Sequence, residues 1–248
     1  LLTRLFGLKT KVILHNHGWE ERVYALEHAA PKISWPRPLT TWKSQLLRYP
    51  LLRLMLRISH ACMCGTLDDI RWLQEHFSRQ RMRYIYVPNG TDSVNTKTLP
   101  GIDPSTIHFL CVGAFTWRKN IAYTLSLFTS VWKSCPNSRL YLVGCGSNPR
   151  ITKSIATYAS GESIIPIPDV PMDEMSKWYR RCPVSITSSR YEGGHTLALL
   201  EAMSFGGVVF ASDIPAHAEF IRTGVNGFLI TGCDIHEDAR RISNAVHN

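Results

Sequence analysis

Short apolar runs alternate with amphipathic stretches along the chain, and this alternation predicts a parallel α/β architecture. In the first hundred residues the pattern predicts strands at Lys11–His15, Ala61–Cys64 and Tyr84–Val87, and helices at Leu51–Ser59 and Asp68–Phe77. Strands separated by helices pair in parallel, because each crossover helix returns the chain to the same edge of the sheet.

Two segments interrupt this pattern. Pro31–Pro50 holds four prolines and two tryptophans, which predicts an excursion or loop region. Thr91–Pro104 is polar and predicts an interdomain linker. We therefore expect a partial N-terminal α/β domain over residues 1–100 and a second domain over residues 101–248.

The second domain repeats the alternation more regularly. Its predicted strands are Ile107–Val112, Arg139–Val143, Ser163–Ile167, Val184–Thr187, Gly207–Ala211 and Gly227–Ile230. Its predicted helices are Ile121–Ser134, Arg150–Ala159, Met172–Arg181, Thr196–Phe205 and Ala216–Arg222. Six strands with intervening helices predict a complete doubly wound, nucleotide-binding sheet.

Composition narrows the class of protein. With 44% hydrophobic and 19% charged residues, the chain has the make-up of a folded globular protein. No stretch approaches the roughly 20 apolar residues of a membrane-spanning helix. The seven cysteines are scattered, several of them within apolar runs, which is typical of reduced thiols in a cytoplasmic enzyme. No Cys/His pair follows Cys62 and Cys64 at zinc spacing, so we expect no metal.

Charge is unevenly placed. Residues 1–100 hold 15 Lys and Arg against 7 Asp and Glu, whereas residues 101–248 hold 13 against 12. A basic first half favours an anionic partner: nucleic acid, a phosphorylated acceptor or an acidic membrane face. No nucleic-acid-binding motif is present, so we expect none bound. An apolar helix is surrounded by tryptophan and arginine, which favours a peripheral site on the inner face of a membrane: Trp35, Trp42, Arg48, Arg53 and Arg57. The same helix could instead pack into the core of the first domain.

The candidate chemistry lies in the window Ser188–Met203, where a strand leads through Gly193 and Gly194 into an apolar helix. Such a turn presents backbone N–H groups at a helix N-terminus, where the macrodipole favours anions. Further along the helix, Glu201 can place a carboxylate near vicinal hydroxyls.

This window resembles the E-x7-E signature of family-4 retaining glycosyltransferases. Other motifs of that family follow in the same order along the chain: Tyr86–Gly90, Val112–Asn120, Tyr141–Ser147, Ala211–Pro215 and Gly224–Leu229. The resemblance implies a GT-B fold, in which two Rossmann-like doubly wound domains face each other across a cleft. It also implies transfer of a sugar, with retention, from a nucleotide-diphosphate-sugar donor to a glycan or lipid-linked acceptor.

The resemblance assigns roles to particular residues. It implies that Glu201 holds the ribose hydroxyls and that Glu192 lies by the donor sugar. It implies that Lys119, with Arg118 beside it, neutralises the departing diphosphate, and that His17 lies near the reacting sugar. Backbone groups of the turn are expected to hold phosphate and sugar: Gly194, His195, Thr196 and Leu197. No cofactor or metal is expected, since cations and a helix N-terminus stabilise the leaving group.

The sequence departs from the family pattern in three ways. Eight residues, not seven, separate Glu192 from Glu201, and Ala114 stands where the family usually has an arginine. The first domain is short, so the chain resembles the family with both ends truncated. These departures favour an alternative, a non-catalytic sugar-nucleotide-binding or partner-docking module. Plainer interpretations also remain: a solvent-facing Glu201, a structural His17, and an exposed loop pair at Arg118 and Lys119.

Overall fold

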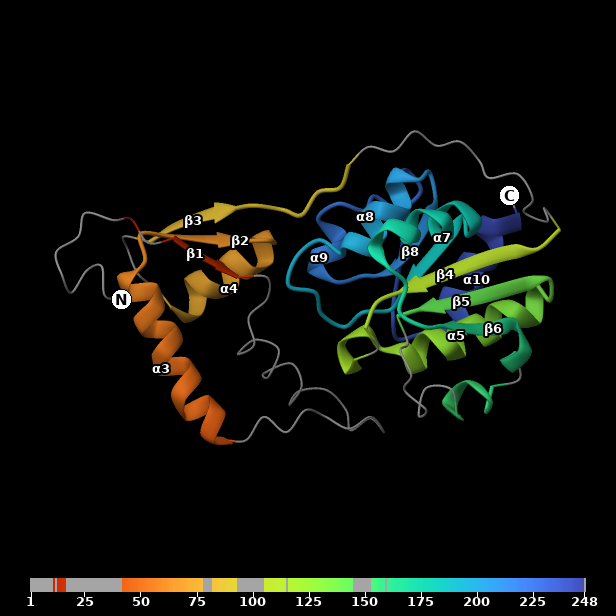
Figure 1. Ribbon diagram of the computed structural model, residues 1–248, viewed down its shortest axis with the longest axis horizontal. Coiled ribbons are helices and arrows are strands. Elements are labelled where there is room, and N and C mark those ends of the chain that lie inside the picture. The colour runs from red at the N-terminus through yellow and green to blue at the C-terminus, as the bar shows by residue number, and fades with distance from the viewer. Residues whose placement is uncertain are drawn as a thin grey trace. The chain divides into compact units, whose positions relative to one another are not determined.

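The computed structural model describes residues 11, 13–16, 42–77, 82–92, 105–114, 116–144, 153–158 and 160–247. By its internal contacts the chain divides into two units, residues 1–89 with 192–195 and residues 90–191 with 196–248. Each unit has a parallel β-sheet of its own (Figure 1), which confirms the predicted α/β class. The predicted division at residue 100 stays a prediction, because residues 93–104 lie outside the described part.

The sheet of the first unit has three described strands, in the order β1-β2-β3: β1 (Ile13–Asn16), β2 (Ala61–Cys64) and β3 (Arg83–Tyr86). Both pairings are parallel, with Ala61 opposite Ile13 on one side and Arg83 on the other. Between β2 and β3 runs α4 (Leu67–His76), one residue earlier at each end than predicted, and the Thr66 hydroxyl caps it by accepting the Asp69 N–H at 3.0 Å.

The helix before β2 is longer than predicted. α3 spans Trp42–Ile58 and passes through Pro50, so the predicted loop Pro31–Pro50 is wrong over residues 42–50. Proline lacks the N–H for one intrahelical bond, but its fixed φ is helical. The helix continues because Leu52 and Leu56, just beyond Pro50, are buried. Residues 31–41 lie outside the described part.

One apolar cluster joins these elements in the first unit. It contains Leu52 and Leu56 of α3, Cys62 and Cys64 of β2, Leu73 of α4, and Phe77. Burial of α3 through these leucines supports the packing alternative for that helix, although its exposed residues leave a second face. No helix in the described residues is long and apolar enough to span a membrane.

The sheet of the second unit has six strands, all parallel: β4 (Ile107–Val112), β5 (Ser138–Val143), β6 (Ile164–Ile167), β7 (Val184–Thr187), β8 (Val208–Ser212) and β9 (Phe228–Ile230). Their order is β6-β5-β4-β7-β8-β9. This confirms the predicted doubly wound sheet. The chain winds outward in one direction from β4 and in the other from β7, so the topological switch point lies between these two strands.

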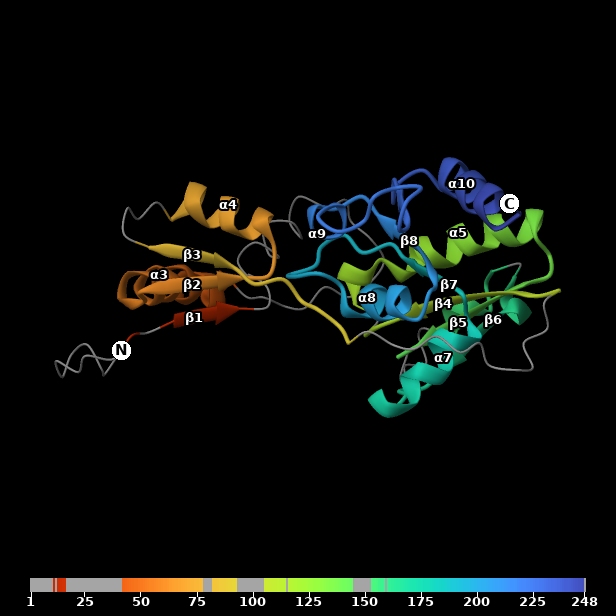
Figure 2. The same cartoon turned by 90° about the horizontal axis from the view of Figure 1, so that it is seen from above.

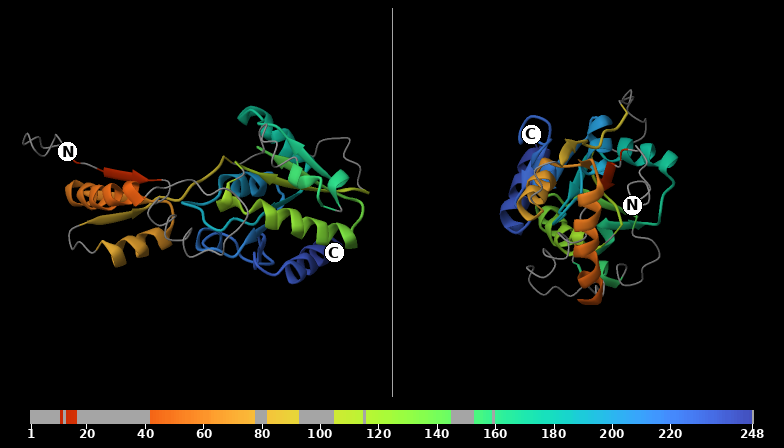
Figure 3. Two further views of the ribbon diagram at one scale, coloured as in Figure 1. Left: turned by 90° about the horizontal axis from the view of Figure 1, so that it is seen from below. Right: turned by 90° about the vertical axis from the view of Figure 1, so that its left-hand side faces the viewer.

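The helical elements of this unit are η1 (Trp117–Lys119), α5 (Ile121–Ser134), η2 (Gly161–Ser163), η3 (Met172–Glu174), α7 (Met175–Arg181), α8 (Leu197–Ser204), α9 (Pro215–Ala218) and α10 (Ile235–His247). Figures 2 and 3 show α5 and α10 on one side of the sheet and α7 on the other. Neighbouring residues of β4 serve both layers. The ring centroids of Phe109 and Phe128 of α5 lie 5.7 Å apart. Leu110 packs in the apolar cluster with residues of α7 and α8 on the other face.

Two helices of the second unit differ from the prediction. α10 was not predicted at all. α9 ends at Ala218, whereas the predicted helix continued to Arg222. The Asn226 side chain stops it, because Oδ1 accepts the Arg222 N–H at 2.6 Å and Nδ2 donates to the Phe220 carbonyl at 2.9 Å. The predicted helix Arg150–Ala159 lies partly outside the described residues.

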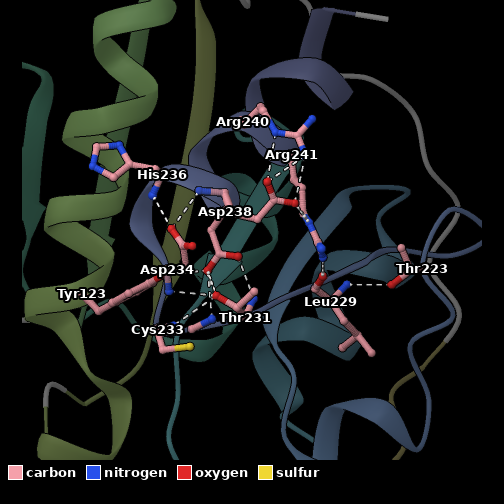
Figure 4. Close-up of polar contacts among 12 residues, drawn as sticks. Tyr123, Thr223, Leu229, Thr231, Cys233, Asp234, His236, Asp238, Arg240 and Arg241 are labelled. Atoms are coloured by element: carbon pink, nitrogen blue, oxygen red, sulfur yellow. Dashed lines mark hydrogen bonds and ion pairs between the residues drawn. The ribbon is translucent and has the colours of Figure 1, made fainter.

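α10 is anchored by a buried carboxylate (Figure 4). Asp238, with none of its surface exposed, accepts hydrogen bonds from the Tyr123 hydroxyl of α5 at 2.6 Å and from the Thr231 N–H at 2.7 Å. Its Oδ2 also accepts the Thr231 hydroxyl and the Gly232 N–H. Asp234 caps the first turn of the helix through the N–H groups of His236 and Glu237.

Candidate active site

Two loops leave the sheet of the second unit at its switch point. One follows β4 and contains η1, and the other follows β7 and leads to α8. Because β4 and β7 are adjacent and parallel, both loops start from the same, carboxyl edge of the sheet. This is the place where doubly wound sheets bind ligands.

Lys119 lies across the end of β4. Gly113 ends this strand with a φ of 140°, and a Cβ built on it would lie 3.3 Å from Cε of Lys119. The alkyl chain of the lysine therefore covers the glycine, and a side chain at position 113 would displace it. Burial raises the pKa of the Cys111 thiol to about 12, and the Lys119 charge opposes this shift. The ammonium group is thus close to the carboxyl end of β4.

Hydrogen bonds tie the two loops together around Asn120. This residue has a φ of 50° and lies between η1 and α5. The Arg190 N–H donates to the Arg118 carbonyl at 2.7 Å, and Nη2 of Arg190 donates to Oδ1 of Asn120 at 3.0 Å. The Ser188 hydroxyl donates to the Asn120 carbonyl at 3.0 Å. Burial lowers the pKa of the Arg190 guanidinium. The loop with Arg118 and Lys119 is therefore held at a fixed place beside the loop after β7.

The N-terminus of α8 lacks the usual side-chain cap. Thr196 is the N-cap residue, but its hydroxyl does not accept from the first amides of the helix. It lies 2.9 Å from Nε2 of the fully buried His217, whose Nδ1 lies 2.8 Å from the Ser212 carbonyl. The carbonyl only accepts, so Nδ1 carries a proton, and in a neutral imidazole Nε2 then accepts from Thr196. The contact with His217 diverts the natural cap from the amides of α8, which leaves that helix end suited to an anion.

Glu201 is the fifth residue of α8 and is half-buried. The Tyr179 hydroxyl of α7 donates to its Oε2 at 2.5 Å. The pKa of Tyr179 is raised, first by burial and then by the hydrogen bond to Glu201, so the phenol remains a donor. Sequence reasoning missed Tyr179, since nothing in the local pattern pairs residues on two successive helices.

Comparison with known proteins identifies the family of the chain. The profile of the family described as "Glycosyl transferases group 1" matches residues 97–248, which is more than half of the chain. The chain belongs to this family. The sequence resemblance to family-4 glycosyltransferases is thereby confirmed at the level of the family.

The relatives extend well beyond this chain in length. The chain is 29% identical over 97 residues to a D-inositol 3-phosphate glycosyltransferase of Streptosporangium roseum, an alignment that covers 39% of this chain and 22% of the relative. An S. aureus TarM mutant, in complex with fondaparinux, alpha-GlcNAc-glycerol and UDP, has a TM-score of 0.74 at 17% identity, over 100% of this chain and 46% of that one. Anabaena HepE in complex with UDP and glucose gives 0.73 at 17%, over 98% and 64%. These structures establish the fold alone.

The other described residues of the predicted site, Glu192, Gly194 and His195, lie in the first unit. Segment 192–195 contacts that unit, where Asn89 Nδ2 donates to the His195 carbonyl at 2.8 Å and the Tyr86 hydroxyl lies 3.1 Å from His195 Nε2. Gly194 pairs with Gly65, on which a Cβ would lie 3.0 Å from the Gly194 Cα. Glu192 is half-buried in the same segment. The glycines allow this close approach.

Two predictions about the site stay predictions. His17, expected near the reacting sugar, lies outside the described residues. The described part contains no cluster of three or more His, Cys, Asp or Glu that could hold a metal ion. The role of each site residue likewise stays a prediction, whereas their positions are now known: Arg118, Lys119, Thr196, Leu197 and Glu201 lie in the second unit.

Proposed function

We propose that this chain transfers a sugar from a nucleotide-diphosphate-sugar donor to a glycan or lipid-linked acceptor, with retention at the anomeric carbon. The observation that carries the proposal is the joined pair of loops at the switch point, where the Lys119 cation covers the end of β4 and α8 begins with its cap diverted. Two structural neighbours are complexes with UDP, and one of them also contains glucose.

In this proposal the donor's diphosphate lies at the start of α8. The N–H groups of a helix N-terminus suit a phosphate, and the diverted Thr196 hydroxyl leaves the first of them to the ligand. The amide of Leu197 contributes to the same site, while the roles predicted for the Gly194 and His195 amides stay predictions. Glu201 binds the ribose hydroxyls from further along α8.

The cations act mainly as the sugar–phosphate bond breaks. Negative charge then accumulates on the diphosphate, and Lys119, with Arg118 beside it, offsets that charge where a divalent ion would otherwise be required. A preorganised cation stabilises the transition state more than the ground state, because the charge it meets grows along the reaction. Glu192 and His17 are the residues proposed to act at the reacting sugar.

Nucleotide binding and transfer are tested in that order. Thermal shift of the chain with UDP, GDP and ADP identifies the donor base, since a ligand of the native state raises the melting temperature by mass action. Release of the nucleoside diphosphate from the matching sugar nucleotide then tests transfer, and NMR of the product's anomeric proton tests retention. No shift with any of the three nucleotides refutes the proposal.

A non-catalytic module is the second candidate. Ala114 and the eight-residue spacing of the two glutamates favour it. Binding of a sugar nucleotide without hydrolysis or transfer, in the presence of candidate acceptors, would support this module over the enzyme.

An anionic membrane surface is the proposed platform for the acceptor. On α3, Leu51 is 53% exposed and Leu54 is 42% exposed, and the exposed Arg53 and Arg57 lie on the same helix. Exposed leucines enter the headgroup boundary, while arginine lays its stem on apolar surface and its charge among phosphates. Each basic residue near an anionic leaflet contributes about 1 kcal/mol.

Vesicle sedimentation tests this platform. The chain is expected in the pellet with anionic vesicles and in the supernatant with neutral ones, and salt should release it. Leu51→Gln with Leu54→Gln should weaken sedimentation, whereas Val225→Gln, at a residue 80% exposed in the second unit, should leave it unchanged. Equal recovery with both kinds of vesicle excludes electrostatic docking.

A further inference from the structure

The contact between Tyr179 and Glu201 joins a buried phenol to a half-buried carboxylate. The hydroxyl donates to Oε2 at 2.5 Å, the short distance expected when an O–H donates to an ionised acceptor. Such bonds are roughly twice as strong as those between neutral groups. The contact is therefore stronger than an ordinary packing hydrogen bond.

The phenol is fixed independently of Glu201. Tyr179 is 3% exposed and its ring stacks on Phe205 with centroids 5.6 Å apart and planes at 20°. Both belong to the cluster that packs α7 and α8 on the sheet, with Leu199 and Ala202. Burial also raises the pKa of the phenol, which favours its protonated, donor form. A rigid donor thus faces the half-buried carboxylate of Glu201.

The remaining acceptor capacity of Glu201 fits a diol. An ionised carboxylate has about four lone-pair positions on its two oxygens, and the phenol uses one of them. Holding a glutamate in one rotamer costs side-chain entropy, which a ligand must otherwise supply on binding. With Tyr179 in place, that ordering is complete before the ligand arrives.

We propose that Tyr179 is a positioning residue, which orients the Glu201 carboxylate for the ribose hydroxyls of the donor nucleotide. The inference rests on the proposed function, because it assumes that Glu201 binds the ribose. It separates Tyr179 from a purely structural tyrosine by one property: loss of its hydroxyl should weaken only those ligands that carry ribose hydroxyls.

The chain supplies a matched control in Tyr123. This tyrosine also donates to a carboxylate within the second unit, Asp238, at 2.6 Å, and burial likewise raises its pKa (Figure 4). Tyr123→Phe therefore removes a comparable hydrogen bond from a different pair of helices. Tyr179→Phe keeps the stacked ring and removes only the hydroxyl.

The experiment measures, by calorimetry, binding of UDP, GDP and ADP and of their 2′,3′-dideoxy counterparts. Tyr179→Phe should weaken the ribonucleotide that binds by about tenfold, the loss expected for a hydrogen bond to a charged group. Binding of the dideoxy counterpart should change less than about twofold, within the scatter of a surface substitution. Tyr123→Phe should leave both ligands unchanged.

A second pair of variants does not depend on the folding of Tyr179→Phe alone. In the Glu201→Gln background the phenol donates only to a neutral oxygen, so adding Tyr179→Phe should weaken ribonucleotide binding by a smaller factor than it does in the unaltered chain. Equal weakening of both kinds of nucleotide, or an undiminished effect of Tyr179→Phe beside Gln at position 201, would overturn the inference alone. Absence of any nucleotide binding by the unaltered chain would overturn the proposed function and this inference together.

Discussion

Replacing Asp238 with asparagine tests how α10 is held to the second unit. The carboxylate is fully buried and accepts four hydrogen bonds, one at Oδ1 from the Thr231 N–H and three at Oδ2. An amide nitrogen at the Oδ2 position would face the Gly232 N–H, so asparagine should place its nitrogen toward Thr231. The Thr231 N–H then loses its acceptor, and the other three donors meet a neutral oxygen.

The cost follows from these contacts. An unsatisfied buried N–H costs about 1–3 kcal/mol, and weakening three charge-assisted bonds brings the total to about 2–4 kcal/mol. For a chain of this length each kcal/mol corresponds to roughly 2–4 °C, so the melting temperature should fall by about 4–16 °C. Differential scanning calorimetry of the purified variant measures the change.

Asp234→Asn is the matched control, since Asp234 is exposed and caps α10, and asparagine caps a helix about as well as aspartate. Its melting temperature should remain within about 1–2 °C of the unaltered chain, as for a surface substitution. If Asp238→Asn has the same melting temperature as Asp234→Asn, the buried hydrogen bonds contribute little to stability, and the account of α10 is wrong.

Two further predictions concern the proposed site. Glu201→Ala should weaken binding of the preferred nucleotide by roughly tenfold or more while the sheet remains folded, which calorimetry and circular dichroism together measure; unchanged affinity would rule out the ribose role. Lys119→Met keeps an alkyl chain over Gly113 and removes the charge, so turnover should fall by a larger factor than the affinity for the nucleoside monophosphate. Equal losses in the two quantities would contradict a role in leaving-group stabilisation, and Lys177→Met, on the exposed side of α7, should change neither.

Much of the sheet could be predicted because its strands are buried on both faces. Every residue of β7 is buried, so Val184–Thr187 reads as one short run between polar turns. The bounds of β4 and β2 were likewise predicted residue for residue. In a parallel sheet covered on both sides, the apolar run itself marks the strand.

The helices show where tertiary contacts override the local sequence pattern. α10 is largely polar, and its position depends on the buried Asp238 and on Tyr123 of α5, more than a hundred residues earlier. α3 continues through Pro50 because leucines after the proline are buried in the first unit. Neither contact has a signature in the neighbouring sequence.

The sequence likewise indicated only part of the candidate site. The turn before α8 and the cations after β4 could be predicted from the order of strand, glycine and helix. The partners of those residues could not: Thr196 with His217 and Glu201 with Tyr179 join different helices through space. Sequence therefore suggested candidate ligand-binding residues, whose roles stay predictions, while the structure adds the side chains that contact them.

The structure locates the eight residues that separate the two glutamates. The eight residues between Glu192 and Glu201 comprise a segment that contacts the first unit and a stretch that begins with the N-cap Thr196. Glu201 keeps a fixed place relative to Thr196, because both belong to the same regular helix and its cap, and its bond to Tyr179 confirms that place within the second unit. An extra residue in the loop before Thr196 therefore leaves the proposed ribose site intact. It can alter the positions of Glu192, Gly194 and His195, so any effect of the unusual spacing should appear at the phosphate and the reacting sugar and not at the ribose.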